Sequence, residues 1–175
     1  MKHIITILLV TVSLVACSIL PTTSMQTTSN TATPSIVTRI LPTQMIATNA
    51  QEKTEVRDLV ENFGKRLQNV SLLAPDAAQE IQEQYSEFVS PTLLEMWMND
   101  VSKAPGRIVS SPWPDRIEIT TLTREGSERY VVTGFVVEVT SVEVANGGAA
   151  AKIPVRIIVQ NDQGRWLIAE YAEER

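Results

Sequence analysis

The side chains best suited to chemistry are few in this chain, and two of them lie near its N-terminus. The chain has one histidine, His3, and one cysteine, Cys17. Beyond Cys17 there is no imidazole to act as a general base, no thiol nucleophile, and no His or Cys ligand for a metal. Chemistry there would depend on carboxylates and phenols. By type and position, the candidates for acid, base or oxyanion donor are Tyr85, Asp100, Asp115 and Tyr130.

Each of these four residues also has a structural explanation. Tyr85 falls on the apolar stripe of a predicted helix, Tyr130 lies in a predicted strand, and both aspartates stand at predicted element ends. The sequence contains no Asp-rich calcium loop, no glycine-rich phosphate loop and no Gly-x-Ser-x-Gly turn. We therefore expect a protein that is not an enzyme and that uses no metal ion and no cofactor.

The first 17 residues follow the pattern of bacterial export. A positively charged start precedes an apolar run from Ile4 to about Ala16. This run is shorter than the ~20 residues that cross a bilayer as a helix, which favours a cleaved signal peptide. It ends in Leu14-Val15-Ala16-Cys17, which resembles the lipobox of bacterial lipoproteins. That resemblance implies removal of residues 1–16 and attachment of lipid, with acyl chains such as palmitate, to Cys17.

Two alternatives for this segment are an ordinary signal peptide with a chance cysteine and an N-terminal membrane anchor. Cys17 has no second cysteine with which to form a disulfide inside the chain. Lipidation accounts for an exported lone cysteine, and two or three acyl chains would anchor it stably. We expect a lipid anchor in the cell membrane, with the protein on the extracytoplasmic side of the cell envelope.

Composition divides the remaining chain into a tether and a folded domain. Residues 17–48 are rich in Thr, Ser and Pro and carry one charge, Arg39, which is typical of a disordered tether. Residues 52–175 contain all 20 Asp and Glu but 13 of the 15 Lys and Arg, a net charge of −7. Such an acidic domain is a poor ligand for nucleic acid, whose phosphates select basic surfaces.

Three helices are predicted at the start of the domain, which we place at residues 49–175. Asn49 resembles an N-cap, and an apolar stripe at helical spacing follows it to about residue 70. Pro75 suits the first turn of a second helix that contains Tyr85. Ser90 and Pro91 resemble the cap and first residue of a third helix, which ends before residues 105–106.

A strand pattern replaces the helical period after residue 114. Four strands separated by turn residues are predicted, over residues 116–124, 129–144, 153–160 and 166–171. Helices followed by an antiparallel meander indicate an α+β fold, with three helices packed on a curved four-stranded sheet. The element order, the long second strand and the closing pattern 163–168 resemble the NTF2-like (cystatin-like cone) superfamily. That resemblance implies a cone between helices and sheet, where enzymes of the superfamily place their sites, and sheet-mediated dimers in many members.

Two sets of side chains are candidates for binding. Five aromatic residues could line a pocket in the cone, although core packing explains them better: Tyr85, Trp97, Trp113, Tyr130 and Trp166. The second strand is apolar on both faces, which indicates either a covered outer sheet face or a sheet curled enough to bury both faces. Strand alternation assigns Ile158, Leu167 and Tyr171 to that outer face. With two valines of the second strand, Val132 and Val136, they form the candidate interface.

The function that these patterns favour is a non-catalytic protein-interaction module of the cell envelope. Its partner would be another envelope protein or a second copy of the chain. The alternatives are a carrier of a small apolar ligand in the cone, and a histidine-free isomerase or dehydratase. A sealed apolar core would favour the interaction module, and an open cavity lined by Trp and Tyr would favour the carrier.

Overall fold

A computed structural model describes residues 42–174, and their side chains from residue 48 onward. All of these residues belong to one compact unit, Arg39–Arg175. The predicted signal peptide, the lipobox with Cys17 and the predicted tether up to residue 41 lie outside the described residues.

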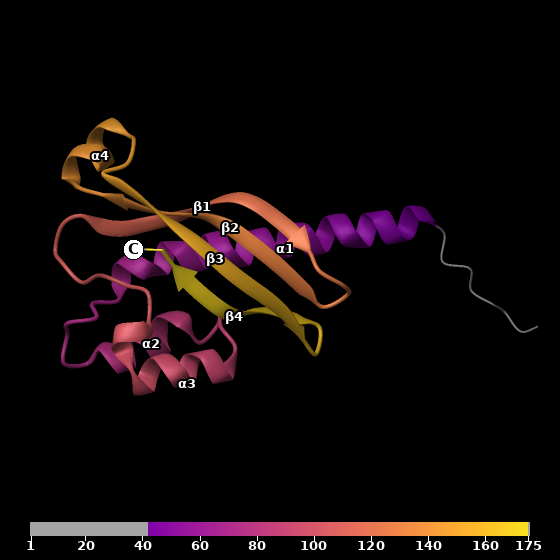
Figure 1. The fold of residues 1–175 in the computed structure, drawn as a ribbon, viewed down its shortest axis with the longest axis horizontal. Helices are drawn as coiled ribbons and strands as arrows, with labels where there is room; N and C mark the ends of the chain where they lie inside the picture. The colour runs from indigo at the N-terminus through magenta and orange to yellow at the C-terminus, as the bar shows by residue number, and fades with distance from the viewer. Residues whose placement is uncertain (1–41, 175) are drawn as a thin grey trace, which may run out of the picture. The chain divides into compact units, whose positions relative to one another are not determined.

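The first helix, α1, spans Pro42–Arg66 and runs along the sheet (Figure 1). It begins seven residues before Asn49, so the predicted N-cap and the predicted tether end at residue 48 are wrong. The reason is local, because no second proline interrupts α1 after Pro42, and proline itself suits a first helical turn. The predicted apolar stripe is confirmed: Val56, Val60 and Phe63 are fully buried.

Two short helices, α2 (Ala77–Tyr85) and α3 (Pro91–Asn99), complete the helical layer. The cap of α3 is the predicted one, because the Ser90 side chain accepts a hydrogen bond from the backbone N–H of Leu93 at 3.3 Å, with Pro91 in the first turn. Pro75 precedes α2 instead of lying in its first turn. A 3-10 turn, Val101–Lys103, follows α3.

Four strands form one antiparallel meander in the order β1-β2-β3-β4 (Figure 1). Their bounds are Trp113–Arg124, Arg129–Val139, Ala151–Asp162 and Arg165–Glu173. The predicted α+β fold with a four-stranded antiparallel sheet is confirmed. The second strand is shorter than predicted, because residues 141–146 form a fourth helix, α4 (Ser141–Asn146). A capping box between Thr140 and Glu143 starts it, and this local bond outweighs the β propensity of the valines.

Three β-bulges change the face of the sheet on which the following side chains lie. Strand β1 has an extra residue at Asp115 and another at Thr120, relative to β2. Between β3 and β4, Ile158 pairs with Glu170 while Val159 pairs with Ile168, so Ala169 is the extra residue. A one-residue bulge reverses the inward and outward alternation of every later residue on that strand.

The candidate-interface prediction is wrong for Val132, Val136 and Tyr171, which do not lie on the outer face of the sheet. Val132 and Val136 pair with Ile157 and Ile153, which belong to the helix side, and cross-strand partners share a face. The bulge at Ala169 reverses the alternation of the residues after it, so Tyr171 lies on the helix side of the sheet and packs on the core.

Two apolar residues of the opposite face of the sheet are hardly exposed. Ile158 and Leu167 lie outside the core cluster, yet only 0% and 6% of their surfaces are exposed. Ion pairs join β1 and β3 across β2 there: Arg116 contacts Glu118 at 2.7 Å, and Lys152 contacts the same carboxylate at 2.5 Å. Among the described residues, the large apolar side chains left exposed all lie outside the strands.

We predict that Gly64→Ala destabilises the domain by about 2 kcal/mol. Alanine in an exposed helix interior normally stabilises by about 1 kcal/mol relative to glycine. At Gly64, however, a Cβ would lie 2.6 Å from the backbone nitrogen of Ile117, so α1 and β1 would have to separate. Urea denaturation followed by tryptophan fluorescence measures the change.

The matched control is Asp58→Ala, at an exposed position of the same helix. It should leave the free energy of unfolding unchanged or slightly higher, because alanine has the greater helix propensity. Stabilisation by Gly64→Ala would show that α1 does not contact β1 this closely.

Candidate functional site

The space between helices and sheet is filled by a cluster of aromatic rings. Phe63 of α1 lies with its ring centroid 5.0 Å from that of Tyr85, 6.3 Å from Trp97 and 5.9 Å from Tyr171. These distances are those of stacked and edge-to-face aromatic packing. One ring from each of α1, α2, α3 and β4 thus meets at the centre of the core.

The aromatic residues predicted to line a pocket pack mainly in the core. Four of them belong to the buried core cluster: Tyr85, Trp97, Tyr130 and Trp166. Tyr130 and Trp166 form a second edge-to-face pair, 5.1 Å between centroids. Trp113 is half-buried at the start of β1, paired with Val139. Core packing therefore explains these residues.

The two candidate phenols are buried, and burial favours their protonated form. The buried Tyr85 hydroxyl donates a hydrogen bond to the Pro105 carbonyl at 2.8 Å. Burial raises the pKa of Tyr85 far above its ordinary value, and the charges of Glu173 and Glu80 raise it further. Burial also raises the pKa of Tyr130. Both groups therefore stay protonated at neutral pH.

The two candidate aspartates have partners of their own. Asp100 accepts hydrogen bonds from the hydroxyl and backbone N–H of Ser102, and hydrogen bonds from Ser102 and Lys103 lower its pKa. Asp115 forms an ion pair with Arg116 at 2.8 Å. Asp100 is thus an exposed, ionised cap, and Asp115 forms an ion pair at a β-bulge. Both of these roles are structural. None of the four candidate catalytic residues lines the pocket described next.

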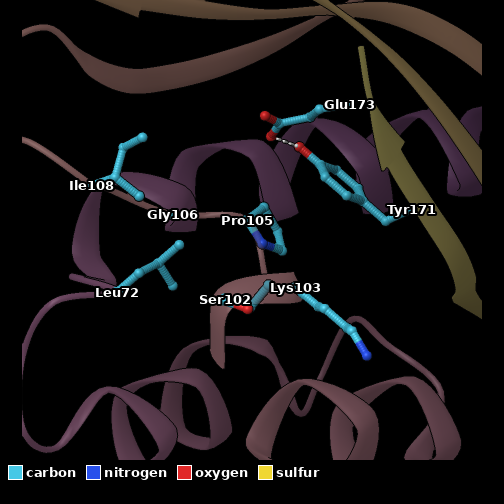
Figure 2. A pocket seen from close by; sticks show the side chains of 9 residues that line it. Leu72, Ser102, Lys103, Pro105, Gly106, Ile108, Tyr171 and Glu173 are labelled. Atoms are coloured by element: carbon cyan, nitrogen blue, oxygen red, sulfur yellow. Dashed lines mark hydrogen bonds between the residues drawn. The ribbon is translucent and has the colours of Figure 1, made fainter. Parts of the chain in front are cut away.

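A pocket of about 280 Å³ lies where the loop after α3 meets the end of β4 (Figure 2). We call it the mouth pocket. Its walls are apolar on one side and carry a carboxylate, an amine and hydroxyls on the other; the lining residues are Leu72, Ser102, Lys103, Ala104, Pro105, Gly106, Ile108, Tyr171 and Glu173.

Backbone hydrogen bonds fix the loop that forms the apolar wall. The Arg107 N–H donates to the Val70 carbonyl at 2.8 Å, and the Leu72 N–H donates to the Arg107 carbonyl at 2.9 Å. These bonds hold residues 70–72 beside residues 106–108. A Cβ on Gly106 would lie 2.9 Å from the Val70 carbonyl oxygen, so glycine permits this close approach. The wall is therefore pre-formed.

The polar side of the mouth pocket is held by β4 and the 3-10 turn. The Tyr171 hydroxyl donates to the Glu173 carboxylate at 2.5 Å (Figure 2). Lys103 lies 3.3 Å from Asp100 in an exposed ion pair. Both β4 residues face the pocket because of the bulge at Ala169. Sequence reasoning missed Glu173 for this reason, although it predicted that the third helix ends before residues 105–106.

Residues 42–174 lack two further kinds of feature. This part of the chain has no group of three or more His, Cys, Asp or Glu side chains placed to hold a metal ion. Nor does any helix there combine the length and apolar character that a membrane crossing requires.

Comparisons with known proteins find distant structural likenesses. No protein-family model matches the chain. No curated protein matches it in sequence. A structure titled Rd1NTF2_05, an NTF2-like designed protein, matches with a TM-score of 0.35 and 16% identity, over 71% of this chain and 99% of that chain. The intermembrane space region of the chloroplast protein ARC6 matches with a TM-score of 0.34 and 14% identity, over 74% and 94%. Likenesses at this level concern the path of the chain alone.

We predict that Tyr85→Phe lowers the free energy of unfolding by about 1–2 kcal/mol. The ring still fills the core, but the buried Pro105 carbonyl loses its donor. Tyr130→Phe makes the same chemical change in the other aromatic pair and should cost less. Equal losses in the two variants, measured by urea denaturation, would contradict a special role for the Tyr85 bond.

Tyr85 should also make the domain sensitive to alkali. Its pKa is raised in the folded state, so its contribution to stability is complete below the ordinary tyrosine value of 10.0 and is lost as the pH rises above it. We expect wild type to lose up to about 1.4 kcal/mol per pH unit more than Tyr85→Phe above that pH. Parallel slopes in urea titrations between pH 8 and 11.5 would contradict this assignment.

Proposed function

We propose that this protein is a lipid-anchored, non-catalytic protein-interaction module on the extracytoplasmic side of a bacterial cell membrane. An NTF2-like α+β domain is its folded part, and the lipid on Cys17 is its anchor. Its partner is another protein of the envelope or a second copy of the chain.

The filled interior is the observation that carries this proposal. Phe63, Tyr85 and Trp97 occupy the space in which a carrier or an enzyme would bind a small molecule, and each is almost completely buried. The mouth pocket, of about 280 Å³, lies at the edge of this core, where Tyr171 borders both. A packed core beside a shallow rim supports recognition of a protein surface.

The roles of the four candidate catalytic residues support the same conclusion. Of the groups that the sequence offered for catalysis, Tyr85 is a buried hydrogen-bond donor and Asp100 an exposed cap. Catalysis by general acid and base needs groups whose pKa values lie near the working pH and that meet at a cavity. The four candidates are engaged elsewhere, which leaves binding as the better-supported activity.

The anchor is tested by substitution of the lipidated cysteine. In a bacterial host fed a radiolabelled or clickable fatty acid, wild type should incorporate label and sediment with membranes, because several acyl chains bind a bilayer stably. Cys17→Ala should incorporate none and should lose the membrane association or be retained as an uncleaved precursor. Label on Cys17→Ala, or unlabelled wild type, would contradict the lipoprotein assignment.

The interaction function is tested by native mass spectrometry of protein extracted from its own host membrane. We expect a dimer or a defined complex with another protein, without a small-molecule adduct. A monomer that carries a reproducible small-molecule mass would instead identify a ligand carrier or an enzyme.

A further inference from the structure

Exposed apolar side chains gather beside the mouth pocket. Leu73 is 77% exposed, Ile108 47% and Val109 53%. Residues 70–72 and 106–108 are held side by side by the backbone bonds of Arg107, so these three side chains lie on neighbouring segments. Leu72 and Ile108 themselves line the pocket. We call Leu73, Ile108 and Val109 the apolar rim.

The mouth pocket, beside this rim, has one carboxylate in its lining together with apolar side chains. Glu173 faces the pocket from β4 and is oriented by the Tyr171 hydroxyl (Figure 2). The Leu72, Pro105 and Ile108 side chains stand opposite it. A long basic side chain suits such a site, because its methylene stem can pack on apolar groups while its charged end reaches a carboxylate.

The charge of the whole domain selects the same kind of ligand. Residues 52–175 carry a net charge of −7, which attracts a cationic partner and repels a second acidic copy. It also disfavours docking on an anionic bilayer. Lys103 is the cation among the lining residues, and it already has Asp100 at 3.3 Å. A positively charged segment with apolar neighbours therefore fits the surface better than an acidic one.

We propose that the mouth pocket and the apolar rim bind a segment of a partner protein in which a lysine or arginine is flanked by apolar residues. The inference rests on the proposed interaction function and specifies the surface and the partner's chemistry. The basic side chain enters the pocket toward Glu173, and its apolar neighbours cover Leu73, Ile108 and Val109.

Selection from a peptide library tests this without a known partner. Full-length protein in nanodiscs of neutral lipid is the bait for random 12-residue peptides displayed on phage, with counter-selection on the Glu173→Gln variant. We expect enriched peptides to share one Lys or Arg between apolar residues. For a synthetic enriched peptide, Glu173→Gln should weaken the Kd about tenfold, the typical effect of one charge-assisted bond.

Matched variants test whether peptide binding depends on the apolar rim or on any exposed apolar side chain. Leu73→Ser and Ile108→Ser should each weaken the same Kd about fivefold, since each removes apolar area from the contact. Val142→Ser should leave it unchanged, because Val142 is 60% exposed but lies on α4, away from the pocket lining. Replacing the peptide's arginine by citrulline should weaken binding to wild type and have little further effect on Glu173→Gln.

Several results would overturn the inference. These are enrichment of acidic or wholly apolar peptides, no enrichment, or equal binding by wild type and Glu173→Gln. If sedimentation shows self-association and Ile108→Ser abolishes it, the rim binds a second copy of the chain. If the wild type binds vesicles and Ile108→Ser does not, the rim binds lipid. A native complex that persists in Glu173→Gln would refute this surface alone, whereas a monomer with a small-molecule adduct would refute the interaction function.

Discussion

Contact of the Phe63 ring with aromatic rings of other elements holds the helices and the sheet in one arrangement. Its partners come from α2, α3 and β4, so a shift of any one element would open a void beside Phe63. Voids of this kind cost several kcal/mol in a domain of marginal stability. The Tyr85 hydroxyl extends the same constraint outward, because it fixes the Pro105 loop on which the mouth pocket depends.

The bulge at Ala169 connects this core to the candidate binding surface. It turns Tyr171 toward Trp97, 6.0 Å between ring centroids, and it turns Glu173 toward the pocket. Without the extra residue, strict alternation would put both side chains on the outer face. One inserted residue therefore supplies an aromatic ring to the core and the carboxylate to the surface.

The sequence predicted those features that depend on local pattern. The buried face of α1, the Ser90 cap and the four strands each follow from spacing or from one capping residue. The sheet face on which Tyr171 lies could not be predicted from the sequence. A bulge depends on how two strands pair, and an argument from strict alternation assumes that there is no bulge. Val132 and Val136 were misplaced for a related reason: a strand that is apolar on both faces does not reveal which face meets the helices. The facing of Glu173 depends on the same bulge, and the apolar rim depends on loops brought together by tertiary contacts.

The two extra residues in β1 have a consequence for how molecules of this protein meet. Strand β1 is an edge of the sheet, and edges normally offer an unbroken row of backbone donors and acceptors. Asp115 and Thr120 interrupt that row twice within twelve residues, so a strand from a neighbouring molecule cannot stay in register along it. Crowding of many copies on one surface would then not lead to fibre-like growth through this edge.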